Sequence, residues 1–557
     1  MEAFPKGKRR FLEYAGVGLL VWFLVGAILY PALTTLAAGV TKGSALTLEH
    51  YAAFFNSSAG LTVLKNTIVM GVLTMLICGV VGTGLAFCVH FFDFPCKNIV
   101  DKLLLLPVMM PGIIIVFAFV QLYGESGLVT KTIESLLGLE EAPYTFSGLP
   151  GILFIHALTQ YVYYYITASL AIKQIDYSLI ESARGLGASR LKVLTSVIRP
   201  SLAPALITSA AVTFMTGLGS FTAPSIMGGG YKVLSTQMLL AKANNYMGLA
   251  AVQAAALTSI SLALFIFFRW YEKRKLFAHS VRGTPFQPIP LDNPLVKWSV
   301  ITGTAILGFL ILLPFFTVIL LSFVDSGAWM VSIYPEKFCL DNYIDIFTKP
   351  RPFRPIYNSL VMSLAAAALC LAIAVPSSYV IEKTKYKVRW LIDVLVMLPW
   401  AMPAGAVAIN IITANASPNI FAFNAVLVGS CILLPLGYFV RSLPIVVKIT
   451  QISLQGLNDA YLDASTSLGA SRSETFRKVV LPILSPGLLA GFILAFVRGI
   501  GEYNVSAFLY TASNKPISIA MVNAIFEYNI GLAMAYGALL ILLTIVLSLV
   551  ISKIKRG

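Results

Sequence analysis

Residues 186–190 read Leu-Gly-Ala-Ser-Arg, and the same five residues return at positions 468–472. Upstream of the first copy, residues 66–112 align without a gap on residues 358–404. The matching positions include asparagine, cysteine, aspartate and proline, which chance similarity between apolar segments rarely places in one register. The chain therefore reads as a tandem duplication, and a repeat of this kind decides the fold before any motif is considered.

Composition places both copies in a membrane. Of the 557 residues, 58% are hydrophobic and 11% are charged, and the mean hydropathy is +0.84. Apolar runs of about 20 residues can cross the hydrocarbon core as helices, whereas transmembrane strands would alternate every two residues. Twelve spans are predicted: 12–39, 61–91, 100–123, 150–171, 200–226, 247–270, 296–323, 357–381, 390–413, 421–445, 482–511 and 530–553.

The prediction is an all-α transmembrane fold of twelve helices in two six-helix repeats. The first repeat covers residues 1–275, a cytoplasmic linker covers 276–295, and the second repeat covers 296–557. Because six is an even number, both repeats insert with the same orientation. The repeats are therefore parallel, and a substrate path is expected on a pseudo-twofold axis along the membrane normal.

The net charge of +16 reflects membrane topology. Lysine and arginine gather in alternate loops, for example at 173–199 and 441–478, as the positive-inside rule expects. Both termini are then cytoplasmic. The basic loops explain the charge without any bound nucleic acid, and the first helix is too long for a cleavable signal peptide.

The sequence indicates no catalytic site. The six cysteines are scattered and the four histidines form no cluster, so neither a metal site nor another cofactor is predicted. No phosphate-binding loop of the type G-x-x-x-x-G-K-[ST] occurs, since Gly228-Gly229-Gly230 leads into Tyr231-Lys232. We predict no catalytic residue and no enzymatic activity.

The loops around the repeated five residues are the most informative segments. Residues 181–190 read Glu-Ser-Ala-Arg-Gly-Leu-Gly-Ala-Ser-Arg, and residues 463–472 read Asp-Ala-Ser-Thr-Ser-Leu-Gly-Ala-Ser-Arg. Each predicts a short amphipathic helix, a glycine turn and a basic helix that reaches a proline. Such a loop can present a rigid helix to a groove in a partner protein. The alternative is that the two glycines only cap helices.

These loops resemble the EAA loop of ABC importer permeases, whose pattern is Glu-Ala-Ala, three residues, Gly, and later Ile-x-Leu-Pro. In that family the short helix docks into the ATPase subunit. The resemblance implies ATPase-coupling roles for Glu181, Ala183, Gly187, Pro200, Asp463, Gly469 and Pro482. Ser182, Arg199 and Ser465 depart from the pattern, as does Asp463 in place of glutamate.

The resemblance also implies the partners and the location. Two copies of a cytoplasmic ATP-binding subunit would dock on the two loops, and an extracytoplasmic solute-binding protein would deliver the solute. Because both halves lie in one chain, no second permease chain is required. The multi-pass protein would lie in the lipid bilayer of a prokaryotic plasma (inner) membrane.

A second pair of motifs follows the loops, Phe214-Met-Thr-Gly-Leu-Gly-Ser-Phe221 and Phe496-Val-Arg-Gly-Ile-Gly-Glu-Tyr503. Small residues let helices approach closely, and an ionisable group inside a membrane marks a functional site by default. Arg498 and Glu502, four residues apart, are expected on one helix face, as a gate, a substrate site or a structural ion pair. The predicted translocation path comprises Gly217, Gly219, Ser220, Phe221, Arg498, Gly499, Glu502 and Tyr503.

The solute is less determined than the family. The segment after Phe221 and the fusion of both halves resemble permeases for iron(III), 2-aminoethylphosphonate and thiamine, so iron(III) or 2-aminoethylphosphonate is the first expectation. The rival functions are an ion-gradient-driven secondary transporter and a membrane-embedded enzyme. A secondary transporter would leave the repeated loops unexplained. A membrane-embedded enzyme would need a metal cluster or a nucleophile–base pair, and the sequence contains neither.

Overall fold

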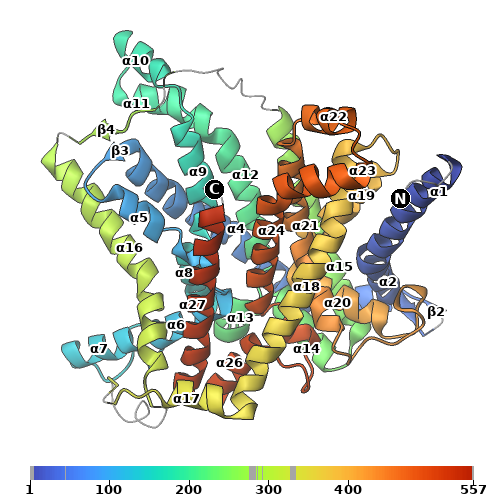
Figure 1. The fold of residues 1–557 in the computed structure, drawn as a ribbon. Coiled ribbons are helices and arrows are strands. Elements are labelled where there is room, and N and C mark those ends of the chain that lie inside the picture. Colours follow the sequence, from blue (N-terminus) through green and yellow to red (C-terminus); the bar gives the residue numbers. More distant parts are fainter. Residues whose placement is uncertain are drawn as a thin grey trace. The chain divides into compact units, whose positions relative to one another are not determined.

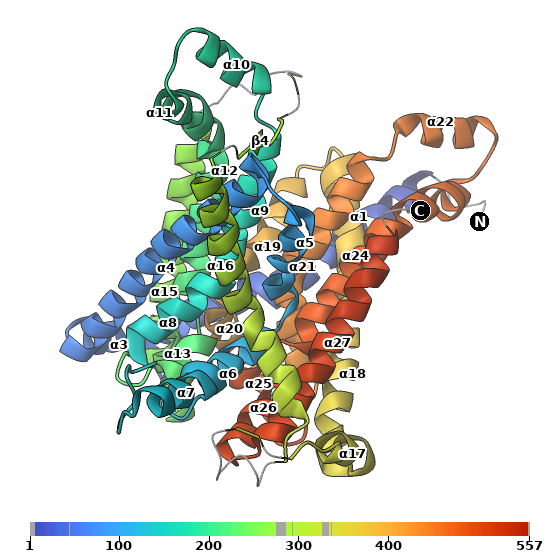
Figure 2. The same cartoon turned by 90° about the vertical axis from the view of Figure 1, so that its left-hand side faces the viewer.

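The computed structural model describes residues 6–43, 45–274, 284, 286–291, 293–325, 334–335 and 337–554. The predicted linker lies partly outside the described residues, at 276–283, 285 and 292. Most of the described chain is helical (Figures 1 and 2), which confirms the all-α prediction. The described strands have two residues each: β1 Thr41–Lys42, β2 Ala45–Leu46, β3 Phe92–Asp93 and β4 Ile289–Pro290.

Ten helices among the described residues are long and apolar enough to cross a membrane, or eleven if one bent pair counts as a span. The sequence prediction was twelve spans, slightly more than this number. The predicted span 150–171 forms two shorter helices, α8 (Gly148–Thr159) and α9 (Tyr161–Lys173), which meet at Gln160. Neither alone has the length of a membrane span.

Prolines break the third predicted span of each half, as their paired positions indicate. In the first half, η2 (Leu106–Met109) ends just before Pro111, which precedes α6 (Gly112–Tyr123). In the second half, α19 (Arg389–Ala401) and α20 (Ala404–Asn415) are bent by 117° at Met402-Pro403. Proline lacks the N–H that a helix interior needs, and the residue before it avoids the helical conformation.

The described chain forms two compact units. The first-half unit, residues 56–237 and 256–337, contains α4 (Ser58–Phe91), β3, α5 (Lys97–Leu103), η2, α6, α7 (Leu128–Leu137), α8, α9, α10 (Tyr177–Gly185), α11 (Arg190–Val193), η3 (Leu194–Ile198), α12 (Arg199–Leu218), α13 (Thr222–Met227), β4 and α16 (Pro294–Ser322).

The second-half unit comprises residues 1–55, 238–255 and 338–557. It contains α1 (Lys6–Leu24), η1 (Val25–Leu29), α2 (Tyr30–Gly39), β1, β2, α3 (Glu49–Phe55), α17 (Asp341–Thr348), α18 (Pro350–Lys383), α19, α20, η5 (Ile420–Ala422), α21 (Leu433–Gln455), α22 (Asp459–Ser467), α23 (Arg472–Thr475), η6 (Phe476–Val480), α24 (Leu481–Ile500), α25 (Ser506–Leu509), α26 (Ile517–Phe526) and α27 (Ile530–Ile554). Both α14 (Leu234–Ala243) and α15 (Met247–Arg274) are divided between the units.

The two halves exchange their first long helices. Helix α16, the first of the second half, packs against α4, α5, α6 and α8 and runs along the first-half unit in Figure 1. Helix α2 packs against α20, and η1 against α19 and α21, inside the second-half unit. Each compact unit therefore contains a helix from the other repeat, and the repeat boundaries at 275 and 296 stay a prediction from the sequence.

Equivalent asparagines make equivalent contacts in the two units. Asn66 donates through Nδ2 to the carbonyl of Lys232 at 3.0 Å, and Asn358 donates to the carbonyl of Lys515 at 3.0 Å. The next residues, Thr67 and Ser359, each accept a backbone N–H through the side-chain hydroxyl. The duplication therefore extends to side-chain hydrogen bonds, which explains why these polar residues recur inside apolar runs.

Candidate functional site

The two loops that carry the repeated five residues have one architecture. We call residues 176–200 the first Gly-Ala-Ser-Arg loop and residues 458–482 the second. The first contains α10 and α11 and joins α9 to α12, and the second contains α22 and α23 and joins α21 to α24. Figure 2 shows α10 and α11 projecting beyond the ends of α9 and α12, and α22 projecting beyond α21. Each loop thus presents a short helix outside the long helices of its own unit.

A left-handed glycine ends each short helix. Gly187 has φ +80° and Gly469 has φ +81°. Gly187 donates its N–H to the carbonyl of Arg184 at 2.9 Å, and the N–H of Ala188 reaches the carbonyl of Ala183 at 3.0 Å. The second loop repeats this pair of hydrogen bonds. Together they form a Schellman motif, in which glycine avoids the steric penalty of a Cβ. The predicted glycine turns are confirmed, and Ala183 contributes its carbonyl to the first.

An exposed leucine side chain lies directly before each glycine turn. Leu186, directly before the glycine, is 89% exposed, and Leu468 in the second loop is 88% exposed. Glu181 and Asp463 are also exposed on these helices. The two loops therefore expose a leucine at equivalent places. Sequence reasoning did not single them out, although both lie inside the repeated five residues.

The prolines after the loops follow wide helical turns. In η3 the N–H of Arg199 donates to the carbonyl of Leu194, and in η6 the N–H of Leu481 donates to the carbonyl of Phe476. Pro200 and Pro482 come next and have no N–H to donate. Because proline also excludes the carbonyl four residues earlier, the helix widens to a π-turn instead of breaking. Each loop is therefore continuous with its long helix through a π-turn.

Each loop begins with a polar cap, but the loops differ at the second short helix. Ser189 accepts the N–H of Lys192 at 3.3 Å. In the second loop Ser471 and Glu474 form a reciprocal capping box: the serine Oγ accepts the N–H of Glu474, and the glutamate accepts the N–H of Ser471 at 3.0 Å. The N–H and the hydroxyl of Ser471 both donate to the Glu474 carboxylate, and these two hydrogen bonds, with the charge of Lys478, lower the pKa of Glu474 from its ordinary 4.5.

The capping box predicts a local response to substitution and pH. Ser471→Ala is expected to destabilise the start of α23 by about 1 kcal/mol, measured as faster amide exchange there. Because the pKa of Glu474 is lowered in the folded chain, its stabilising effect is complete above pH 4.5 and is lost as the pH falls through the lowered value. Ser485→Ala, in α24, is the control. Equal exchange in the two variants would contradict the cap.

The predicted path glycines lie where long helices pack inside each unit. A Cβ on Gly217 would lie 3.0 Å from the side chain of Thr74, and one on Gly499 would lie 3.0 Å from Ser363 Oγ. These distances are too short for an unperturbed contact. The glycines therefore permit close approach of α12 to α4 and of α24 to α18, and their place on a solute path stays a prediction.

The ends of α12 and α24 form matching corners. Gly219 caps the end of α12, and the carbonyl of the next residue, Ser220, accepts Ser235 Oγ at 2.6 Å. In the second half the carbonyl of Glu502 accepts Ser518 Oγ at 2.9 Å. Phe221 and Tyr503, the next residues along the chain, are both buried.

The expected helix face shared by Arg498 and Glu502 is absent. Helix α24 ends at Ile500, with Gly501 as its cap, so Glu502 leaves the helical register. Its Oε1 accepts the N–H of Val505 at 3.2 Å. Within the part of the chain that the structure describes, the two side chains form no ion pair. Arg498 is exposed and Glu502 half-buried. The four-residue spacing predicts a shared face only if the helix continues to residue 502, and α24 ends before it.

A buried histidine supports the first corner and was missed. His156, only 2% exposed, hydrogen-bonds through Nδ1 with Thr74 Oγ1 at 2.8 Å and through Nε2 with Ser220 Oγ at 2.9 Å. Its carbonyl also accepts the Cys78 thiol. One imidazole thus connects α4, α8 and the corner after α12. A lone histidine inside an apolar run was the available signal, since such a residue needs buried partners.

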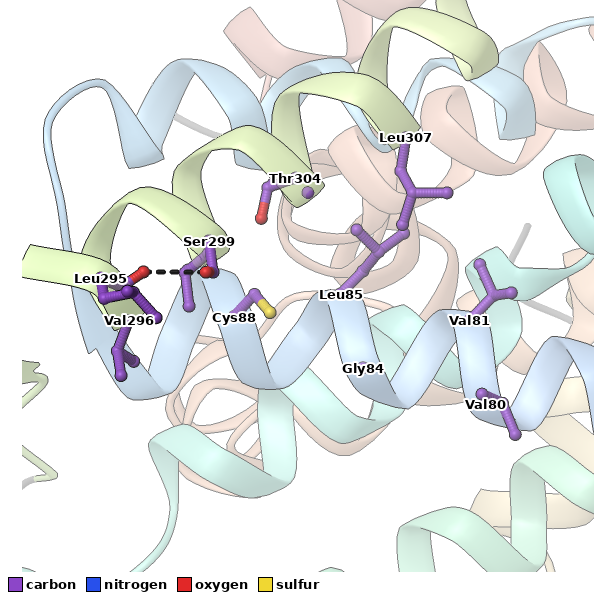
Figure 3. A pocket seen from close by; sticks show the side chains of 12 residues that line it. Val80, Val81, Gly84, Leu85, Cys88, Leu295, Val296, Ser299, Thr304 and Leu307 are labelled. Carbon is purple, nitrogen blue, oxygen red and sulfur yellow. Dashed lines mark hydrogen bonds between the residues drawn. The ribbon is translucent and has the colours of Figure 1, made fainter.

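A cavity of about 490 Å³ lies between α4 and α16 (Figure 3). Its lining is mostly aliphatic, and Cys88, Ser299 and Thr304 supply its thiol and hydroxyl groups. Ser299 Oγ donates to the carbonyl of Leu295 on its own helix. None of the predicted coupling or path residues lines this cavity, so it is separate from both candidate sites.

Metal coordination finds no support in the described chain. Among the residues that the structure describes, no group of three histidine, cysteine, aspartate or glutamate side chains is placed to hold a metal ion. The six cysteines, all described, are free.

Comparison with known proteins gives a family match in both halves. Residues 79–276 and 359–556 match the model described as binding-protein-dependent transport system inner membrane component. The probable ABC transporter permease protein y4fN of Sinorhizobium fredii is 28% identical over 557 residues, covering 98% of this chain and 97% of its own. The ferric transport system permease protein FbpB of Actinobacillus pleuropneumoniae is 24% identical, covering 94% of this chain and 75% of its own.

A shorter relative matches one part of the chain. The sulfate transport system permease protein CysT of Salmonella typhimurium is 30% identical over 172 residues, which is 30% of this chain and 62% of that protein. The family model, by contrast, covers more than half of the present chain and occurs twice. The chain therefore belongs to the family of binding-protein-dependent transport system inner membrane components and carries its domain in duplicate.

Proposed function

We propose that this chain is the whole membrane-spanning part of an ABC importer and that α10 and α22 are its two coupling helices. The observation that carries the proposal is the pair of projecting helices with equally exposed leucines, Leu186 and Leu468. Each is held by a glycine turn and joined to a long helix by a π-turn. An ATP-binding subunit docked on each helix would transmit its movement to α12 and α24.

The orientation follows from charge. Basic residues concentrate in the two Gly-Ala-Ser-Arg loops, which favours the cytoplasmic side for both. Both termini then lie in the cytoplasm and the solute-binding protein meets the opposite side. ATP drives transport only because the ATP-binding subunits bind the inward-open and outward-open forms with different affinity.

Subunit stoichiometry tests the coupling assignment. The detergent-purified complex is expected to contain one copy of this chain and two ATP-binding subunits, measured by native mass spectrometry. A complex with a single ATP-binding subunit, or one that needs a second membrane chain, would contradict the proposal. Loss of one bound copy in a Leu468→Glu variant would assign that copy to the second loop.

The solute proposed first is iron(III) or 2-aminoethylphosphonate, with thiamine and sulfate as alternatives. Support for iron(III) comes from similarity to a ferric permease along 94% of this chain, and support for sulfate from the partial match to a sulfate permease. Uptake of each labelled solute into vesicles, with the cognate binding protein and ATP-binding subunits, tests the choice. Accumulation of a different solute would overturn it.

The corner residues offer a test of solute charge. A half-buried carboxylate on the path favours a cation, and a charge-assisted contact contributes about 1.5–3 kcal/mol, or roughly tenfold to a hundredfold. If a cation passes, Glu502→Gln is expected to lower uptake by about tenfold or more, and Arg498→Gln to leave it unchanged. Initial uptake rates measure this. The opposite pattern would indicate an anion, and no effect of either variant would remove both residues from the path.

A further inference from the structure

The described residues of the linker lie against the start of the first Gly-Ala-Ser-Arg loop. Thr284 makes two backbone contacts with the start of α10: its N–H donates to Asp176 Oδ1 at 3.1 Å, and its carbonyl accepts the N–H of Tyr177 at 3.1 Å. Two residues later the ring of Phe286 lies 5.3 Å from that of Phe91 and 6.1 Å from that of Tyr177, centroid to centroid. The linker therefore contacts both the end of α4 and the start of α10.

A short parallel ladder continues these contacts. Ile289 of β4 pairs with Phe92 of β3, and Pro290 pairs with Asp93. Asp93 also forms an ion pair with Lys97, at the start of α5. All of these residues belong to the first-half unit. The chain thus fastens the linker at three successive places before α16 begins.

One carboxylate joins the linker to the helix cap. Asp176 Oδ1 accepts the N–H and the hydroxyl of Ser178 at 3.0 and 2.8 Å, in addition to the N–H of Thr284. An aspartate at this position satisfies an N–H that the helix leaves free, and its negative charge favours the helix N-terminus. The same side chain therefore starts α10 and holds the linker against it.

The second loop is held differently. Asn458 caps α22 by accepting the N–H of Ala460 at 3.0 Å, and Ser465 on α22 hydrogen-bonds with Thr475 on α23 at 2.9 Å. Ala183 occupies the place of Ser465 in the first loop and has no hydroxyl for such a contact. Within the described chain, then, the first loop gains from the linker the support that the second obtains from its own side chains.

We propose that Asp176 and Phe286 are positioning residues for coupling, through which the linker sets the orientation of α10 relative to α4. The inference rests on the proposed role of α10 as a coupling helix. In this arrangement the linker is a structural part of the first coupling site, beyond its role of connecting two repeats. The two coupling sites are then unequal, and damage to the linker contacts affects only one of them.

Two substitutions separate the linker contacts from the cap. Thr284→Pro removes the donor to Asp176 and leaves Asp176 free to cap α10, and Phe286→Ala removes the two ring contacts. In the full chain bound to its ATP-binding subunits, each is expected to raise amide exchange in α10 about fivefold to tenfold, since one net hydrogen bond or ring contact is lost. Exchange in α22 is expected to stay unchanged. Asn458→Ala, which removes the cap of α22, is the matched control. It is expected to raise amide exchange in α22 and to leave exchange in α10 unchanged.

A functional readout distinguishes positioning from mere stability. Solute moved per ATP hydrolysed is expected to fall severalfold in both variants, with two ATP-binding subunits still bound. Unchanged exchange in α10, or an equal rise in α22, would overturn the inference whatever the transport activity. If the unmodified chain moved no solute with its ATP-binding subunits, the proposed function would fail, while the exchange result would still decide whether the linker positions α10.

Discussion

Replacing Gly187 and Gly469 together by valine is expected to reduce ATP-driven uptake by at least about tenfold. Both glycines have φ near +80°, and a left-handed conformation costs an L-residue about 1–2 kcal/mol, with β-branched side chains at the upper end. Both turns would open, and α10 and α22 would lose their fixed angle to the following helices. Because neither turn lies in a membrane span, the chain should still insert, so ATP hydrolysis continues without matching uptake.

Gly185→Ala is the control for this result. Gly185 ends α10, its φ is not positive, and a Cβ there would meet open space. Alanine at a helical position should be neutral or slightly stabilising. Uptake and ATP hydrolysis measured side by side in the same vesicles decide the outcome. Full uptake by the double valine variant would remove the glycine turns from the coupling mechanism.

The double variant Leu186→Glu with Leu468→Glu is expected to lose its ATP-binding subunits. Each leucine is almost fully exposed, so the substitutions should change folding stability by no more than about 0.5 kcal/mol. Truncating or charging a buried interface anchor typically costs 2 kcal/mol or more, a loss of about thirtyfold in affinity for each site. Co-purification and titration with the isolated ATP-binding subunit measure the loss.

Leu46→Glu is the matched control for the exposed leucines. Leu46 is 84% exposed but belongs to β2, far along the chain from either Gly-Ala-Ser-Arg loop. This variant is expected to bind ATP-binding subunits as the unmodified chain does. Equal binding by the double glutamate variant would show that α10 and α22 do not form the docking surface.

The sequence predicted the features that short-range physics controls. The repeated Leu-Gly-Ala-Ser-Arg required a turn, because glycine next to small polar residues tolerates a left-handed conformation. Pro111 and Pro403 are disfavoured inside a regular helix, and a helix begins directly after each of them. The family resemblance carried by the same loops was confirmed by the double family match.

Features that depend on long-range packing could not be read in this way. Composition does not show that α16 and α2 pack with the other repeat. Apolar helices use the same few residue types whichever helix they pack against. The corner at Gly501 removed Glu502 from the helix that spacing had assigned to it. His156 was missed since its partners, Thr74 and Ser220, lie far from it in sequence.

The most direct test of the account is ATP-dependent uptake by the chain in sealed vesicles. With its ATP-binding subunits, binding protein and ATP, the chain should accumulate labelled solute. Omitting the ATP-binding subunits should abolish accumulation, even when a proton or sodium gradient is imposed. Uptake that persisted without those subunits would contradict the central claim that this chain is the membrane part of an ATP-driven importer.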